Sequence, residues 1–149
     1  MESNLTAVEQ GLAQLGHEQD TKLTWSLSGH GHVVDSMRRA IDRTRERLTA
    51  ALPSAELDEL TPALRAAAER GVTIDLVAGD GTAPGLPEAE GVRVRRRPGG
   101  AHGKDRLAVV LGDGQEIVLA DLGLARPEGM WTHHPAVALL VAEHLRDLA

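Results

Sequence analysis

The chain has 149 residues, a formal net charge of -6 and a pI near 5.6, so it is long enough for one domain with a sizeable core. The acidic balance argues against a surface built mainly for nucleic acid. Cysteine is absent, which excludes disulfides, thiol catalysis and cysteine-ligated zinc. No apolar run reaches the ~20 residues of a membrane span and no signal peptide precedes the polar start, so we expect a cytoplasmic protein without a membrane partner.

The first predicted element is a short helix from Asn4 to Leu15. Its apolar residues recur at steps of three and four, the spacing of a coiled-coil seam, at Leu5, Val8, Leu12 and Leu15. A helix this short is marginal in water by itself. We therefore expect residues 1–18 to form a connector helix that contributes a homodimer contact. Packing of this helix on its own domain is the alternative.

The segment from Lys22 to Ser28 alternates apolar and polar residues, which predicts a half-buried strand. The glycine-containing segment after it carries His30 and His32. Two histidines at this spacing can serve a metal ion from an extended segment. Because no third ligand stands nearby in the sequence, we interpret the segment as a polar loop and predict neither a metal site nor a cofactor.

The next predicted helix runs from Val33 to Arg47, and its apolar face consists of Val34, Met37 and Ile41. Its many arginines suggest a nucleic-acid stripe at first sight. However, Asp35 lies four residues before Arg39, so opposite charges share the helix surface and a solvated face is favoured. A short strand, Leu48 to Leu52, follows this helix.

The stretch from Glu56 to Val77 organises the predicted fold. One helix face carries Leu57, Leu60, Leu64, Ala67 and Ala68. Pro62 interrupts this run, and one start that the sequence allows for the regular helix is Pro62 itself, because proline is tolerated in a first turn. Gly71 suits the left-handed position that ends a helix, and a β-branched strand follows it. Two helix–strand units in tandem predict an α/β fold with at least partly parallel strands.

The loop from Ala78 to Gly85 follows a core strand at its carboxyl end, where ligands gather in open α/β sheets, but it lacks the Gly-Lys-Ser/Thr of a phosphate-binding P-loop. The strand after it carries three arginines on one face, at Arg93, Arg95 and Arg97. Charged residues protect a sheet edge against mispairing, which is our interpretation. An anion-binding face is the alternative.

The last third of the chain predicts a β-hairpin and a helix. Strands from Arg106 to Leu111 and from Gln115 to Ala120 flank a Gly-Asp-Gly turn. We expect Asp121 to Gly129 to be irregular. Pro135 opens the final helix, Ala136 to Leu148, whose inward residues are predicted to be Val137, Leu140, Val141 and Leu145.

This order of elements resembles a phospholipase D-like domain, and more narrowly the effector domain of TrmB-type sugar-responsive transcriptional regulators. The resemblance covers roughly Leu23 to Leu148 and rests on Trp25-Ser-Leu-Ser-Gly29, Leu64-Arg-Ala-Ala-Ala-Glu-Arg-Gly-Val72, His102-Gly-Lys104 and Met130-Trp131-Thr132. It implies that residues 22–149 form a sandwich with a mixed, largely parallel sheet flanked by helices. In that family a winged helix-turn-helix domain precedes the effector domain, so we expect contact with DNA only through such a domain outside this sequence.

The phospholipase D signature is His-x-Lys-x(4)-Asp, in which histidine is the nucleophile and lysine holds a phosphate. His102 and Lys104 match it, whereas Val109 stands at the position of the aspartate. Without this carboxylate we expect a non-catalytic domain whose decayed pocket is reused for binding. Plain structural residues at a strand start are a second reading. A phosphodiesterase or hydrolase that uses His102 and Lys104 is the alternative function.

The resemblance implies a small sugar-like effector. We expect it at the carboxyl ends of the parallel strands, where glycine-bearing loops expose backbone groups and a few polar side chains converge. The predicted contacts are Ser28, His30, His102, Lys104, Trp131 and His133. A neutral or acidic sugar derivative is the first expectation, and an anionic one if Arg93 or Arg95 turns inward.

Overall fold

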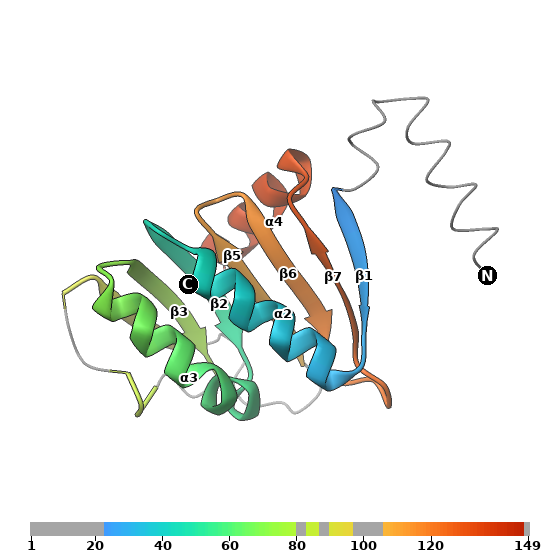
Figure 1. Cartoon of the computed structure of the whole chain (residues 1–149), viewed down its shortest axis with the longest axis horizontal. Helices are drawn as coiled ribbons and strands as arrows, with labels where there is room; N and C mark the ends of the chain where they lie inside the picture. Colours follow the sequence, from blue (N-terminus) through green and yellow to red (C-terminus); the bar gives the residue numbers. More distant parts are fainter. Residues whose placement is uncertain (1–22, 80–82, 87–89, 97–105, 148–149) are drawn as a thin grey trace.

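The computed structural model describes residues 23–79, 83–86, 90–96 and 106–147, and the predicted helix from Asn4 to Leu15 lies outside these ranges. Within them the chain forms seven strands and three helices (Figure 1). In chain order these are β1 (Thr24–Ser28), α2 (His30–Arg43), β2 (Arg47–Leu52), α3 (Ser54–Glu69), β3 (Thr73–Ala78), β4 (Val92–Arg96), β5 (Leu107–Gly112), β6 (Glu116–Asp121), β7 (Glu128–Thr132) and α4 (Pro135–Asp147).

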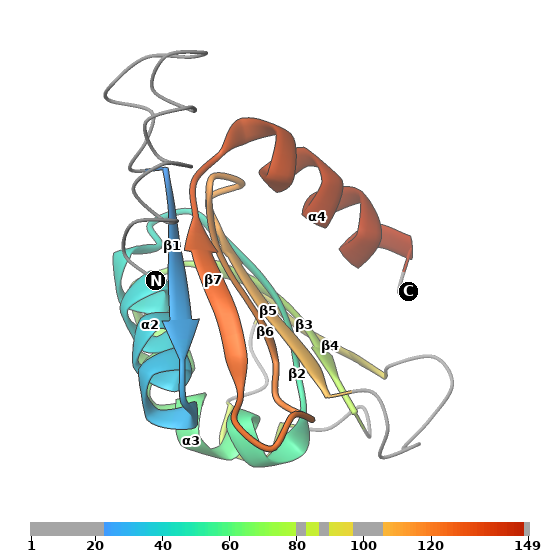
Figure 2. The ribbon, with the colours of Figure 1, turned by 90° about the vertical axis from the view of Figure 1, so that its right-hand side faces the viewer.

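All seven strands belong to one sheet in the order β1-β7-β6-β5-β2-β3-β4. Helices α2 and α3 lie on one face of this sheet and α4 lies on the other (Figure 2). The predicted α/β sandwich with a mixed sheet is confirmed. The parallel share is smaller than expected, because only β2–β3 and β3–β4 pair in parallel while the four other pairings are antiparallel.

Each face of the sheet has its own hydrophobic core. The larger core packs α2 and α3 against the sheet and includes Met37, Ile41, Leu60, Leu64, Ile74 and Leu76. The smaller core lies under α4 and includes Ala51, Val77, Val109, Ile117 and Leu145. Successive strand residues alternate between the two cores, as the period of two in a strand requires.

The helix α3 confirms the predicted apolar face, because Leu57, Leu60, Leu64 and Ala67 are buried. The suggested start at Pro62 is wrong, since the helix begins at Ser54 and contains Pro62. Pro62 is exposed, so the carbonyl that loses its helical partner there can bond water. The predicted stop is confirmed: Gly71 has φ 88° and its N–H donates to the carbonyl of Ala68 at 3.0 Å.

The helix α2 is shifted toward the amino end of the chain relative to the predicted range, Val33 to Arg47. It begins at His30 because Gly29, with φ 93°, turns the chain directly from β1 into the helix. It ends at Arg43 because the carboxylate of Asp113 accepts three consecutive backbone N–H groups, those of Arg45, Glu46 and Arg47. These bonds replace the helical ones, and Arg47 joins β2 instead.

Strand β7 was not predicted, since the sequence pattern indicated irregular chain as far as Gly129. The strand runs between β1 and β6, and Gly129 lets the backbones approach closely: a Cβ there would lie 2.4 Å from the carbonyl oxygen of Leu119. The inward position predicted for Leu140 is also wrong. In α4, Ala138, Val141 and Leu145 face the sheet, and Leu140 is 67% exposed.

Candidate functional site

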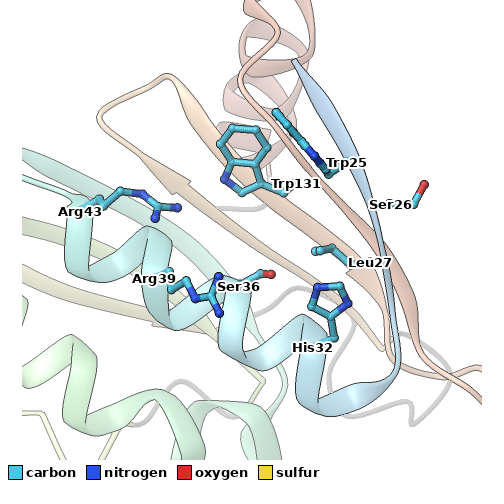
Figure 3. A pocket seen from close by; sticks show the side chains of 8 residues that line it. All are labelled: Trp25, Ser26, Leu27, His32, Ser36, Arg39, Arg43 and Trp131. Atoms are coloured by element: carbon cyan, nitrogen blue, oxygen red, sulfur yellow. The ribbon is translucent and has the colours of Figure 1, made fainter. Parts of the chain in front are cut away.

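One pocket lies between α2 and the paired strands β1 and β7 (Figure 3). It holds about 310 Å³, and we call it the tryptophan pocket because both tryptophans of the chain line it. Its lining residues are Trp25, Ser26, Leu27, His32, Ser36, Arg39, Arg43 and Trp131.

The strand register explains why the two tryptophans meet. Trp25 of β1 lies directly opposite Trp131 of antiparallel β7, and residues opposite each other project from the same face of a sheet. Their ring centroids are 4.8 Å apart and the planes meet at 65°, an edge-to-face contact. Trp25 is 44% exposed, so its ring remains open to a ligand.

Helix α2 supplies the opposite wall of the tryptophan pocket. His32, Ser36, Arg39 and Arg43 recur at steps of four, three and four, so they form one stripe along the helix. Figure 3 shows this stripe lying across from the two indole rings. The stripe offers an imidazole, a hydroxyl and two guanidinium groups. The hydroxyl belongs to Ser36, which is buried, and the guanidinium of Arg39 pairs with Asp35 at 2.6 Å.

Trp131 is oriented by a hydrogen bond from its indole N–H to Oε2 of Glu116 on β6, 2.6 Å away. The same carboxylate accepts from Nε of Arg43, at 3.1 Å to Oε1 and 3.0 Å to Oε2, and it also pairs with Nη2 of Arg43. This hydrogen bonding to Glu116 raises the pKa of the Arg43 guanidinium despite its partial desolvation. Arg43 therefore stays charged and joins α2 to the tryptophan wall.

A second polar cluster lies at the carboxyl ends of β1 and β2. Nε2 of His30 lies 3.1 Å from Oε2 of Glu56 and 3.5 Å from Oε1 of Glu59. Glu56 is 1% exposed, and Nη2 of Arg106 donates to its Oε2 at 3.1 Å. The other oxygen, Oε1, has no hydrogen-bond partner among the residues that the structure describes.

The ligand atoms of His30, Glu56 and Glu59 lie within 4.8 Å of one another, which is close enough to hold a metal ion. Ligand atoms around a tetrahedral zinc lie roughly 3.3 Å apart, given bonds of about 2.0–2.1 Å. However, the guanidinium of Arg106 already supplies positive charge to the buried carboxylate. The arrangement is an ion-pair cluster that neutralises Glu56.

Among the predicted contacts that the structure describes, Ser28 and His30 lie apart from Trp131. Ser28 and His30 lie at the carboxyl end of β1, and the hydroxyl of Ser28 accepts from Nε of Arg126 at 2.9 Å. Trp131 pairs with Trp25, three residues before Ser28, which is roughly 10 Å along the strand.

His133 lies beside Trp131, with ring centroids 5.1 Å apart. The remaining predicted contacts, His102 and Lys104, and the dimer residues Leu5, Val8, Leu12 and Leu15 lie outside the described residues. The two histidines considered for a metal site belong to different clusters. His30 is hydrogen-bonded to Glu56, whereas His32 lines the tryptophan pocket.

Sequence reasoning missed Trp25, Ser36, Arg43 and Glu116 as functional candidates. The helical spacing of His32, Ser36 and Arg39 was a usable signal, but only the position of β7 places Trp131 across from it. Because β7 was not predicted, the partner of Trp25 could not be found from the sequence.

The fold is that of phospholipase D-like domains. The structure of Nuc from Salmonella typhimurium, a phospholipase D family member, matches with a TM-score of 0.58 at 17% identity, covering 84% of this chain and 93% of Nuc. NucT from Helicobacter pylori matches with a TM-score of 0.57 at 11% identity, covering 84% of this chain and 94% of NucT. At these identities the likeness establishes the fold alone.

TrmBL2, an archaeal chromatin protein whose structure shows a novel mode of DNA binding, matches with a TM-score of 0.65 at 18% identity. The match covers 98% of this chain and 61% of TrmBL2, so the chain spans about three fifths of that protein. No curated protein sequence matches the chain. Within the described ranges, no helix combines the length and the apolar character needed to cross a membrane.

Residues 24–141 match the family described as transcriptional regulator TrmB, EBD N-terminal subdomain. The match takes in most of the chain, and the chain therefore belongs to this family. The predicted relationship to TrmB-type effector domains is confirmed. The family assignment indicates a regulatory domain, although structural neighbours of the same fold include members of the phospholipase D family.

Proposed function

We propose that this chain is the effector-sensing domain of a TrmB-type transcriptional regulator and that it binds a small sugar-like molecule in the tryptophan pocket. The observation that carries the proposal is the convergence of Trp25 and Trp131 on the polar stripe of α2. The exposed indole face of Trp25 suits the apolar C–H face of a sugar ring. Ser36 and Arg39 stand across from it to meet hydroxyl or carboxylate groups.

The same pocket explains how binding would reach the rest of the domain. Trp131 bonds Glu116 of β6, and Glu116 bonds Arg43 of α2. A ligand that shifts the indole ring changes the contact between the sheet and α2. Such a differential contact is what a regulatory domain needs in order to favour one of two conformations.

The domain is proposed to bind without catalysing phosphodiester hydrolysis. Val109, at the position of the signature's aspartate, is buried in β5 and packs in the core under α4. An apolar side chain therefore stands where the signature has a carboxylate, and it cannot exchange a proton. Purified protein should not turn over a generic phosphodiester, and turnover that disappears in His102→Ala would show that the domain is an enzyme.

Intrinsic fluorescence tests the effector site directly, because the chain contains only two tryptophans and both line the pocket. Neutral sugars, uronic acids and sugar phosphates are titrated against the whole chain, and binders are confirmed by calorimetry. Arg39→Gln and Ser36→Ala should each weaken binding about tenfold, equivalent to about 1.4 kcal/mol. Arg38→Gln is the matched control, because Arg38 adjoins Arg39 and does not line the pocket.

The same experiment distinguishes the tryptophan pocket from the effector location that the sequence predicted, at the carboxyl ends of the strands. If a sugar that binds the wild-type chain keeps its affinity in Ser36→Ala and Trp25→Leu but loses it in His30→Ala and Lys104→Ala, the effector lies at that end instead. If no member of the panel changes the tryptophan emission or the melting temperature of the protein, the proposed sensing role is wrong.

The partners proposed for the domain are those expected of its family. We propose that it acts as a homodimer through Leu5, Val8, Leu12 and Leu15, and that it influences DNA binding through a winged helix-turn-helix domain. Light scattering on the purified chain gives its mass in solution, and a monomer at all concentrations would contradict the dimer.

A further inference from the structure

A second pocket lies on the opposite face of the sheet from the tryptophan pocket, beside α4. It holds about 370 Å³ and we call it the arginine pocket. Its lining residues are Arg47, Thr49, Asp75, Arg93, Arg95, Leu111, Gly114, Ala142, Leu145 and Arg146. Four arginines from β2, β4 and α4 thus converge on one concave surface, although the chain as a whole carries a net charge of -6.

Residues aligned across four neighbouring strands form the floor of this pocket. Leu111 of β5, Thr49 of β2, Asp75 of β3 and Arg93 of β4 lie side by side in one row across four neighbouring strands. Arg95 follows two residues later on the same face of β4. Helix α4 packs on β2 and β5, so it closes one side of the pocket with Leu145.

The positive charge in the pocket is only partly compensated. Arg95 is paired with Asp75, from Nε to Oδ1 at 3.0 Å and from Nη2 to Oδ2 at 3.3 Å. No side-chain hydrogen bond or ion pair joins Arg47, Arg93 or Arg146 to another residue in the part of the chain that the structure describes. Three guanidinium groups therefore line the same cavity, and no carboxylate among the described residues pairs with them.

Protection of a sheet edge does not account for this arrangement. It can explain the arginines of β4, which is an edge strand of the described sheet. Arg47, however, belongs to β2, which lies between β5 and β3, and Arg146 belongs to α4. Like charges gathered in one pocket repel each other, and a bound anion would remove that repulsion.

We propose that the arginine pocket binds the phosphate group of a small phosphorylated metabolite. Guanidinium groups pair with phosphate oxygens in a bidentate fork, and Asp75 holds the fork of Arg95 in place. Leu111, Ala142 and Leu145 provide an apolar wall for the rest of the molecule. The volume suits a ligand at the small end of the range for metabolite sites. The recessed shape and the absence of tryptophan from the lining favour a small molecule over a nucleic-acid strand.

This inference is independent of the proposed function, because the two pockets lie on opposite faces of the sheet. Calorimetry of the whole chain with inorganic pyrophosphate, glucose 6-phosphate and glucose, in about 150 mM sodium chloride, tests it. We expect the two phosphates to bind in this pocket and glucose not to bind there. Arg47→Gln and Arg93→Gln should each weaken phosphate binding about tenfold or more.

The matched control is Arg96→Gln, because Arg96 adjoins Arg95 on β4 but projects from the other face. It should leave phosphate affinity unchanged. Equal losses in Arg96→Gln and Arg93→Gln, or no phosphate binding by the wild-type chain up to roughly 10 mM, would overturn the proposal. So would Arg93-dependent binding of a DNA duplex without any binding of the small phosphates.

Discussion

The indole N–H of Trp131 donates a hydrogen bond to the carboxylate of Glu116, at 2.6 Å. Arg43 donates hydrogen bonds to the same carboxylate. One acidic side chain therefore positions both Trp131 and Arg43, which belong to opposite walls of the tryptophan pocket. Glu116 is not itself part of the pocket lining. It acts as a positioning residue behind the lining.

Glu116→Ala should lower the free energy of unfolding by about 1–2 kcal/mol, because it removes charge-assisted hydrogen bonds to Arg43 and Trp131 that are partly screened by solvent. Tryptophan emission should shift to the red as the freed indole meets water. Urea unfolding followed by fluorescence measures both effects. Glu128→Ala, at the exposed first position of β7, is the control and should change neither.

Arg106→Met should destabilise the protein by about 3 kcal/mol, because the buried carboxylate of Glu56 would lose its guanidinium partner. The double variant Glu56→Gln with Arg106→Met should regain part of this loss, since no uncompensated buried charge remains. A double-mutant cycle by chemical denaturation gives the coupling. Strictly additive losses would mean that the two side chains do not depend on each other.

Gly129→Ala should cost about 3 kcal/mol, because the added Cβ would lie 2.4 Å from the carbonyl oxygen of Leu119 and force β6 and β7 apart. Gly31→Ala is the control: no atom lies within 4 Å of a Cβ there, and alanine suits the first turn of α2. This control should be stabilising by about 0.5 kcal/mol. Thermal and urea unfolding measure both variants, and an unaffected Gly129→Ala would contradict the position of β7.

Asp113→Asn should lower stability in a pH-dependent way. Desolvation alone would raise the pKa of Asp113, but hydrogen bonds from the N–H groups of Arg47, Arg45 and Glu46 lower it overall. A lowered pKa means that the carboxylate stabilises the fold fully above its unfolded pKa, about 3.9, and loses this contribution as pH falls through the folded value.

The deficit of Asp113→Asn should therefore be about 1 kcal/mol at pH 7 and should shrink below roughly pH 4. Asparagine tolerates the positive φ of 52° at this position, so the turn itself is kept. Urea unfolding of both proteins at a series of pH values checks the expectation. A deficit that grows as the pH falls has the opposite sign and would rule out this role of Asp113.

Changing Leu5 and Leu12 together to aspartate should convert the proposed dimer to a monomer, because two charges would then lie on the apolar seam. Light scattering measures the mass at several concentrations. The double change of Glu9 and Gln10 to alanine, off the seam, is the control. An unchanged dimer mass in the leucine variant would place the contact elsewhere.

The predicted site stays a prediction, and the structure places only some of its residues together. Trp131 and His133 were selected for their chemistry, and the structure places them together, with ring centroids 5.1 Å apart. Their neighbours could not be predicted, because Trp25 and Arg43 reach Trp131 only after β7 has inserted between β1 and β6. The Arg93 and Arg95 face was weighed as an anion site, but Arg47 and Arg146 join it only in the folded sheet.

The sequence by itself determined the features that depend on neighbours in the chain. Gly71 ends α3 because glycine alone adopts its φ without a penalty, and Asp113-Gly114 turns the β5–β6 hairpin for the same kind of reason. The apolar spacing of Leu57, Leu60 and Leu64 likewise predicted a buried helix face. Only the tertiary structure decided the strand order, the insertion of β7 and the pairing of Glu56 with Arg106. Those contacts join residues far apart in the chain, and their energy depends on burial and distance, which no local pattern encodes.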